Sequence, residues 1–246
     1  MNKIIILSVS TLLAVPVFAQ SAQDISTLGC MLEPSETIEV SSPVTSVIEK
    51  IEVKRGQKIT KGQLLFKLRS GVESASVGLA KAKSNFAQRN AERNSELFGD
   101  DLLSTHERDE IETEKLIAAM ELTVKQEELA MRSIYSTVDG VVTDRHNNVG
   151  EYVSTSPVIE VAVLDPLYVE VLMPFENFRD YSTGGILDVV LPEPVSGRHS
   201  AKITIIDPII DSASGTFRMR LELANANYSI PAGVACRLQA VIPSQN

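Results

Sequence analysis

An internal repeat constrains the fold of this chain more than any other feature of its sequence. Residues 42–48 (SPVTSVI) align with residues 136–142 (STVDGVV), and the alignment continues without a gap at a constant offset of 94 residues. Gly56 then matches Gly150. Each copy contains short β-branched segments typical of strands, and each has a glycine where a tight turn requires positive φ. The repeat therefore predicts two copies of one small β unit.

The two copies are separated by residues 71–134, which have the pattern of a long helical hairpin. Apolar residues recur there at alternating steps of three and four, the spacing of two amphipathic helices packed along a coiled-coil seam. They are Val72, Ala75, Leu79, Ala82 and Phe86 on the way out and Ile117, Met120, Val124, Met131 and Ile134 on the way back. Arms of this length extend about 40 Å, more than a compact core needs. We therefore expect the hairpin to project from the β unit.

Each arm also carries a helix start signal. Ser70 with Glu73, and Ser104 with Glu107, fit the S-x-x-E capping box, in which the serine and glutamate side chains bind the free amides of the first turn. The turn between the arms is expected at residues 99–101.

The N-terminal residues have the pattern of a secretory signal peptide. A short positive start precedes an apolar run over residues 4–18, and small residues occupy the cleavage positions. We expect residues 1–19 to form this peptide, with cleavage before Gln20. An uncleaved membrane anchor is one alternative, which Pro16 disfavours. Another is a lipoprotein signal ending at Cys30, although that residue lies well beyond the apolar run.

Composition narrows the class of protein. The chain has 246 residues, is 43% hydrophobic and 22% charged, and has a formal net charge of -9, which suits a folded protein. A chain this acidic lacks the lysine and arginine surface that phosphate binding requires, so we expect no nucleic-acid partner. We also expect no membrane-spanning segment after the signal peptide.

Two cysteines occur, Cys30 and Cys236. Both lie in alternating apolar patterns typical of strands. Disulfides persist in exported proteins, so the two cysteines either pair or serve as two small buried core residues. The sequence leaves both possibilities open.

The two half-motifs resemble the halves of a biotinyl/lipoyl carrier domain, a flattened β-sandwich with quasi-twofold symmetry. In carrier enzymes a tight hairpin between the halves presents a modified lysine, whereas here Arg69 and Ser70 lead straight into the predicted helical hairpin. A lipoyl-type fold without this lysine, split by a coiled-coil hairpin and placed behind a signal peptide, is similar to the periplasmic adaptor family. Its members are also called membrane fusion proteins, of the HlyD and resistance-nodulation-division efflux type.

The C-terminal third fits the same resemblance. Short strand patterns separated by turn residues indicate a small antiparallel barrel. They cover residues 167–173, 186–191, 201–205, 217–223 and 233–242. The segment 28–33 lies where adaptors lend an N-terminal strand to such a barrel. The resemblance thus places Cys30 and Cys236 in one barrel and makes a disulfide geometrically reasonable.

The resemblance implies an elongated α+β fold, in which a lipoyl-like β-sandwich is split by an α-helical coiled-coil hairpin and joined to a small antiparallel β-barrel. We expect a signal peptide at 1–19, an N-terminal segment with the first barrel strand at 20–35, lipoyl half-motifs at 36–70 and 135–164 around the hairpin at 71–134, and the barrel at 165–246. The membrane-proximal domain of many efflux adaptors is expected to be absent.

At the predicted hairpin tip, Arg93, Leu97 and Ser104 reproduce the R-x3-L-x6-S pattern with which members of the family dock onto outer-membrane channels of the TolC type. Arg93 offers a charged fork to carbonyls or carboxylates, Leu97 an apolar knob and Ser104 a hydroxyl beside a tight turn. Each residue alone also fits an ordinary role, as a solvated helix residue, a seam residue and an N-cap. Together, in the spacing of the family, they favour docking.

The second arm is strongly acidic, and most of its carboxylates are expected to form a solvated face. Pairing with a neighbouring protomer is the alternative, because adaptors of this family assemble into a sheath of hairpins. Leu122 and Leu129 lie off the predicted seam and either broaden it or contribute to such contacts.

No pattern for catalysis is found. His106, His146 and His199 are far apart in the sequence and far from both cysteines, so neither a metal site nor a nucleophile with a base can be assembled. We therefore expect a protein that is not an enzyme and needs no cofactor or metal.

The function that the resemblance implies is that of a periplasmic adaptor in a tripartite efflux or secretion system. Its partners would be an inner-membrane transporter, of the resistance-nodulation-division type, and a TolC-like outer-membrane channel, with self-association into a ring. Two alternatives stay open: an exported carrier or enzyme subunit that reuses the lipoyl fold, and a structural coiled-coil protein of the periplasm.

Overall fold

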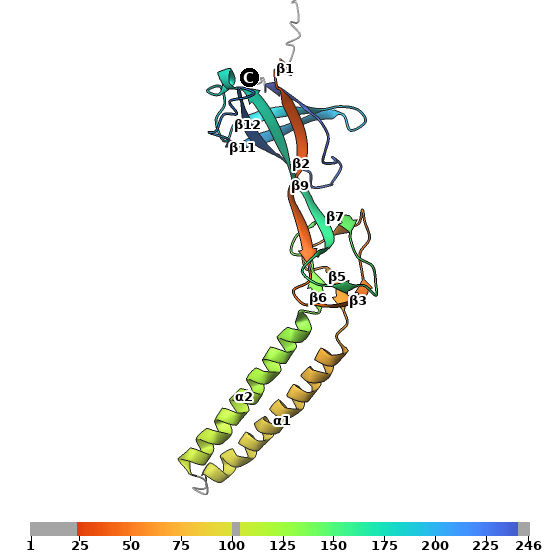
Figure 1. Ribbon diagram of the computed structural model, residues 1–246. Helices are drawn as coiled ribbons and strands as arrows, with labels where there is room; N and C mark the ends of the chain where they lie inside the picture. Colours follow the sequence, from red (N-terminus) through yellow and green to blue (C-terminus); the bar gives the residue numbers. More distant parts are fainter. Residues whose placement is uncertain (1–23, 100–103, 241–246) are drawn as a thin grey trace, which may run out of the picture.

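The computed structural model describes residues 24–99 and 104–240. The protein is elongated, with a barrel-like β unit, a small β-sandwich and a helical hairpin following one another along a bent axis (Figure 1). Both ends of the described chain lie in the barrel-like unit, at the end of the molecule remote from the hairpin tip. The predicted signal peptide and most of the predicted turn at 99–101 lie outside the described residues.

The sandwich combines short strands from both sides of the hairpin with the lower halves of two long strands. Its short strands are β3 (Ser46–Ile51), β4 (Lys58–Ile59), β5 (Leu64–Leu68), β6 (Ser133–Tyr135), β7 (Gly140–Arg145) and β8 (Tyr152–Val153), and the long ones are β2 (Gly29–Ser41) and β9 (Pro157–Pro174). Apolar residues from both halves form one buried core, which includes Phe66, Ile134 and Val158.

The predicted repeat is confirmed, because the two halves exchange strands symmetrically. In the antiparallel pairs, β3 of the first half joins β8 of the second, and β4 joins β7. The amide of Ile48 donates to the carbonyl of Glu151 at 2.9 Å, and the amide of Val142 donates to that of Gln57 at 3.0 Å. These four positions are related by the same offset of 94 residues. The sandwich therefore has quasi-twofold symmetry.

The first residues of each half show the same symmetry in their side chains. The Ser136 hydroxyl donates to the carbonyl of Val138 at 2.6 Å and accepts from its amide at 3.3 Å. The Ser42 hydroxyl makes the same two bonds with Val44. Such local bonds stabilise a turn before a strand.

Two long strands run through both β units and join them. β2 pairs with β9 in an antiparallel ladder from Gly29–Leu172 to Ser41–Pro157, with register shifts near each end of the lower half. The boundaries expected at 35/36 and 164/165 therefore fall inside continuous strands. A second contact ties the units together, since Lys58 Nζ donates to the carbonyl of Asn227 at 3.1 Å and lies 4.7 Å from the ring centroid of Tyr228.

The barrel-like unit consists of the upper halves of β2 and β9 with five further strands. They are β1 (Asp24–Ile25), β10 (Ile186–Leu191), β11 (Gly197–Ile206), β12 (Thr216–Leu223) and β13 (Arg237–Ala240), and a short 3-10 helix, η1 (Phe175–Asn177), follows β9. The sheet runs β1-β13-β10-β11-β12-β9, with β2 on the other edge of β9. Alternate residues such as Val169, Met219 and Leu221 point inward to a single core.

The expected barrel is not closed by a continuous strand ladder in the described residues. Between β2 and the segment before β13 there is one isolated bridge, Met31–Ala235, and single hydrogen bonds such as Leu32 N to Val234 O at 2.9 Å. The preceding chain contains Pro231, which lacks an amide donor, and Gly233, whose positive φ of 83° bends the backbone out of strand conformation. The seam is therefore held by separate contacts.

The hairpin consists of α1 (Gly71–Gly99) and α2 (Thr105–Ala130). α2 ends four residues before the predicted end of the hairpin, because Ile134 belongs to β6 and is buried in the sandwich core. At the root of the hairpin the amide of Leu68 donates to the carbonyl of Arg132 at 2.8 Å, so the two ends of the insertion meet.

The predicted seam of the hairpin is wrong in phase by one residue on α1. Leu79 and Phe86 are exposed, whereas Ala80 and Ala87, one position further on, are buried against α2. The prediction is also wrong on α2, where Ile117, Met120 and Val124 are exposed. The residues of lowest exposure on α2 instead fall at alternating steps of four and three: Ile111, Lys115, Ala118, Leu122, Lys125 and Leu129. Leu122 and Leu129 thus lie on the face towards α1. Small alanines at the contact allow the two helices to approach closely, and the larger apolar side chains lie beside the contact.

Only one of the two predicted capping boxes forms. At the start of α2 both reciprocal bonds between Ser104 and Glu107 are present. At the start of α1 the Glu73 carboxylate instead pairs with Arg132 at 2.7 Å. The predicted box at Ser70 is therefore wrong, because a cation distant in sequence takes its acceptor.

Within residues 24–99 and 104–240, neither helix is both long and apolar enough to cross a bilayer.

Candidate functional site at the hairpin tip

The tip is built from the last turns of α1 and the first turn of α2. Arg93 and Leu97 are four residues apart on α1 and therefore lie on the same face of that helix. The Arg93 side chain is exposed and has no hydrogen bond or ion pair to the described residues. Residues 100–103 and the side chain of Leu97 lie outside the described part.

Ser104 is the N-cap of α2, and three hydrogen bonds join it to Glu107. The Ser104 hydroxyl accepts from the amide of Glu107 at 3.2 Å and donates to its carboxylate at 2.7 Å, and the carboxylate accepts from the Ser104 amide at 2.9 Å. The bond from the Ser104 backbone, followed by the bond from its side chain, lowers the pKa of the fully exposed Glu107. The first turn of α2 is thereby held in one shape.

The tip offers groups for recognition. Arg93 presents a guanidinium that is always charged and has five N–H donors. The Ser104 hydroxyl has committed its proton to Glu107 and keeps an acceptor lone pair. A partner that supplies a carbonyl or carboxylate to Arg93 and a donor to Ser104 fits these groups.

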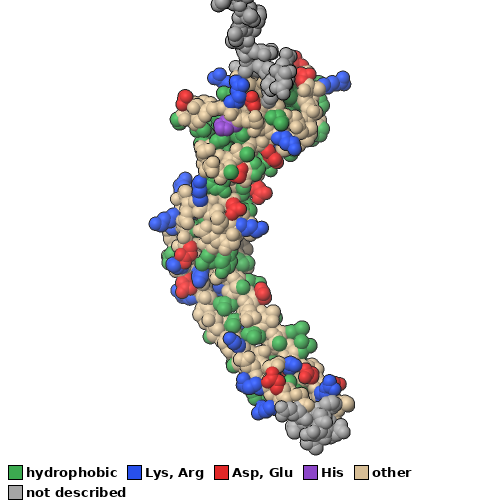
Figure 2. Space-filling model, turned by 180° about the vertical axis from the view of Figure 1, so that it is seen from behind, with side chains coloured by type: hydrophobic (Ala, Val, Ile, Leu, Met, Phe, Trp, Pro, Cys, Tyr) green, Lys and Arg blue, Asp and Glu red, His purple; other side chains and the backbone are tan. Residues whose placement is uncertain are grey.

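An apolar groove along one side of the hairpin was not predicted. It has a volume of about 570 Å³ and lies between α1 and α2. Exposed apolar side chains line it: Leu79, Ile117, Met120 and Val124. Charged residues border it, with Lys83 lying 3.7 Å from Glu121 across the two helices. Figure 2 shows hydrophobic side chains at the surface along the hairpin. The sequence signal for this groove was the set of large apolar residues at the predicted seam positions, which turn out to be exposed.

The two helices differ in charge. α1 has four lysine and arginine residues and three glutamates, whereas α2 has three lysine and arginine residues and eight carboxylates. α1 is therefore weakly basic and α2 strongly acidic, so the two sides of the hairpin attract opposite charges.

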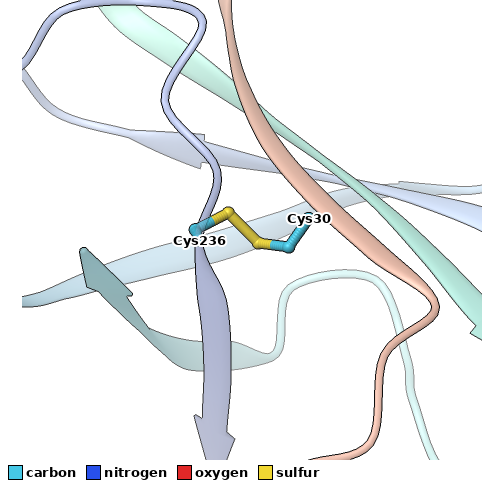
Figure 3. The surroundings of a disulfide bond; sticks show 2 residues. All are labelled: Cys30 and Cys236. Carbon is cyan, nitrogen blue, oxygen red and sulfur yellow. A yellow bond between two sulfur atoms is a disulfide. The ribbon is translucent and has the colours of Figure 1, made fainter. Parts of the chain in front are cut away.

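Cys30 and Cys236 are joined by a disulfide, with their Cα atoms 5.0 Å apart (Figure 3). The bond lies at the seam between β2 and the segment leading into β13, where the amide of Cys236 also donates to the carbonyl of Cys30 at 2.9 Å. A thiol in this bond is not available for acylation, so the lipoprotein interpretation of Cys30 conflicts with the structure. The disulfide joins the two edges that no ladder connects.

The three histidines lie in different parts of the molecule. His106 is on α2, His146 follows β7 in the sandwich and His199 is on β11 in the barrel-like unit. Among the residues that the structure describes, no group of three or more histidine, cysteine, aspartate or glutamate side chains could hold a metal ion.

A split β-sandwich with a helical hairpin between its halves and a second β unit beyond it is the adaptor fold of membrane fusion proteins. Residues 36–162, about half of the chain, match the model of the CzcB-like barrel-sandwich hybrid domain, and the chain belongs to that family.

Curated relatives are efflux-pump linkers and a protein without an assigned role. ArpA of Pseudomonas putida, an antibiotic efflux pump periplasmic linker protein, is 24% identical over 220 residues, which cover 82% of this chain and 59% of ArpA. An uncharacterized protein of Haemophilus influenzae is 22% identical over 223 residues, 90% of this chain and 58% of its own length. The chain thus spans about three fifths of the length of these relatives.

Solved structures share the fold. A MacA-MexA chimera that contains the α-hairpin of Pseudomonas aeruginosa MexA matches with a TM-score of 0.75 and 20% identity, over 89% of this chain and 79% of the chimera. The membrane fusion protein Spr0693 of Streptococcus pneumoniae matches with a TM-score of 0.70 and 15% identity, over 87% of this chain and 99% of its own.

Proposed function

We propose that this protein is a periplasmic adaptor subunit of a tripartite efflux or secretion system and has no enzymatic activity. It links an inner-membrane transporter, of the resistance-nodulation-division type, to a TolC-type outer-membrane channel. The observation that carries the proposal is the hairpin itself, which projects from the β body at the end opposite to both described chain ends (Figure 1). Two observations support a location in the periplasm: the periplasmic linkers among the relatives and the signal-peptide pattern of residues 1–19.

The proposed contact with the channel is at the hairpin tip, through Arg93, Leu97 and Ser104. An arm of 29 residues reaches about 43 Å from the sandwich. Little of this length packs against the β body, because the hairpin contacts that body only at its root. An arm whose two helices pack only on each other is suited to reach a distant partner.

Pull-down of the channel tests the tip. The amount of channel recovered is compared for three proteins: the wild type, an Arg93→Asp/Ser104→Arg double variant, and Arg89→Asp as the matched control. Arg89 is an exposed arginine one turn before Arg93 on the same helix. We expect the double variant to lose the channel and the control to retain it, and equal recovery with all three would reject the tip assignment. Arg93→Asp alone separates docking from capping, since it leaves the Ser104 cap intact.

Self-association into a ring is the second part of the proposal. Large apolar side chains are exposed along both helices of the hairpin, and those of Leu79 and Met120 line the groove. The weakly basic α1 of one copy complements the acidic α2 of the next. Such a contact joins two different faces, and a repeated contact of this type generates a closed ring when the rotation closes.

A further inference from the structure

One residue at the root of the hairpin touches both helices and the sandwich. Arg132 follows Met131, the C-cap of α2. Its guanidinium lies 2.7 Å from the carboxylate of Glu73, in the first turn of α1, and donates to the carbonyl of Thr45 at 3.3 Å. Its own carbonyl accepts from the amide of Leu68, on β5. Arg132 therefore connects the starting turn of one helix, the end of the other and two segments of the sandwich.

This ion pair is more shielded than the others on the hairpin. The side chains of Arg132 and Glu73 are 18% and 20% exposed, whereas those of Lys83 and Glu121, which also join α1 to α2, are 59% and 52% exposed. Shielding from water and salt strengthens a charge pair with good geometry, and exposed pairs contribute little. Arg132 and Glu73 therefore restrain the hairpin root more than the other pairs do.

Other polar contacts at the root hold the connection before α1 against the sandwich. The amide of Arg69 donates to the carbonyl of Val47 at 2.9 Å, and the Ser46 hydroxyl donates to the carbonyl of Arg69 at 3.3 Å. A change of backbone angles in the short connections would swing the whole arm. The contact of Arg132 with Glu73 and Thr45 opposes this swing, because it spans from α1 to the sandwich.

We propose that Arg132 is the positioning residue that sets the direction in which the hairpin leaves the sandwich. A guanidinium serves this role because its planar fork reaches Glu73 and Thr45 at once, whereas the single ammonium of a lysine favours one of them at a time. This direction is a property of the isolated chain, and it bears on the proposed docking function only because the arm presents the tip.

Distances between two spin labels measure this direction. Labels are attached through Asn85→Cys on α1 and Lys54→Cys in the sandwich, both exposed positions. The native cysteines are the only two in the sequence and are joined to each other, so the introduced thiols are the ones that react. The wild-type pair should give one narrow distance distribution. We expect Arg132→Met to broaden this distance distribution at least twofold or to shift its maximum. Arg132→Lys should give a distribution between those of the wild type and Arg132→Met.

Glu73→Gln removes the charge while keeping the size of the side chain, so it provides the test even if Arg132→Met fails to fold. Glu128→Gln is the matched control, because it makes the same change at an exposed position of α2 and removes the exposed pair with Lys125. A distribution unchanged in Glu73→Gln and in folded Arg132→Met would overturn the proposal, as would equal broadening in the control. The spin-label measurement contains no channel. Its result therefore does not depend on whether the proposed docking is correct.

Discussion

Ser104 and Glu107 are joined by three hydrogen bonds, so the residue proposed to contact a channel is also the residue that starts α2. A short hydroxyl is suited to both roles, because its oxygen has two acceptor lone pairs and the bond from the Glu107 amide uses one of them. Substitutions at this position therefore have to separate helix capping from recognition.

Ser104→Ala should fray the first turn of α2 and destabilise the helix by about 1 kcal/mol, the usual cost of losing an N-cap. Ser104→Thr is the matched control, since threonine also caps helices and keeps the hydroxyl that donates to Glu107. Amide hydrogen exchange in residues 105–108 measures the effect. Equally fast exchange in Ser104→Thr would show that the cap does not govern this turn.

Acid should loosen the same turn. The hydrogen bonds from Ser104 lower the pKa of Glu107, so its carboxylate stabilises the folded turn fully above the ordinary glutamate pKa, and this contribution is lost as the pH falls through the lowered value. An NMR titration of the Glu107 carboxyl carbon should therefore show a pKa below the ordinary one in the wild type. In Ser104→Ala the pKa should rise towards the ordinary value. An identical titration in both proteins would contradict this account.

Removal of the disulfide should destabilise the barrel-like unit. Cys30 and Cys236 are 206 positions apart in sequence, and a cross-link over so long a loop restricts the unfolded chain strongly. We expect Cys30→Ala/Cys236→Ala to lower the free energy of unfolding of this unit by about 2–5 kcal/mol. Hydrogen exchange in β13 under increasing urea measures it. Reductant should shift the wild type towards the double variant and leave the double variant unchanged.

Two glycine substitutions should have opposite effects. A Cβ atom at Gly140 would lie 2.6 Å from the carbonyl oxygen of Ala162, so Gly140→Ala should destabilise the sandwich. Gly78 lies inside α1 with open space around it, and Gly78→Ala should stabilise the hairpin by about 0.5–1 kcal/mol. Thermal unfolding followed by circular dichroism distinguishes the two. Stabilisation by Gly140→Ala would show that the strands there can separate without cost.

Charges placed in the hairpin groove should weaken self-association. Leu79→Lys/Met120→Lys introduces two cations into the exposed apolar surface proposed to meet a second copy. Gln126→Lys, at an exposed position of α2 outside the groove, is the control. Sedimentation at rising concentration should show a smaller species for the double variant alone. Equal assembly of all three proteins would exclude the groove as the contact.

The period of the hairpin could be predicted from its sequence, but its phase could not. Leu79 and Ala80 are both apolar and adjacent, so two seams one residue apart fit the same spacing. Which seam faces the partner helix depends on how closely the helices approach, and alanine allows the closer contact. The seam predicted through Leu79 is wrong, because the smaller Ala80 is the residue buried against α2.

Local signals predicted the tip better than the root. The cap formed by Ser104 and Glu107 uses residues three apart, and it is present. The cap predicted at Ser70 has the same local pattern, but Glu73 is drawn to Arg132, which is 59 residues away. A sequence pattern does not show such a distant competitor. The docking assignment of Arg93, Leu97 and Ser104 stays a prediction.

The β units could be recognised but not divided from sequence. The strand over Ile186–Leu191 has the predicted bounds, because turn residues mark both of its ends. β2 and β9 instead continue through Pro34 and Pro166, residues that are disfavoured inside sheets. Their mutual pairing carries them past these positions, and that pairing is a long-range property.

Because the insertion begins and ends at neighbouring points, marked by the bond between Leu68 and Arg132, the length of the arm is independent of the body that carries it. Seven residues added to each helix would lengthen the arm by about 10 Å and leave every strand pair in place. The length of this one segment therefore sets how far the arm reaches. Proteins with the same β body could span cell envelopes of different width through changes in the hairpin alone.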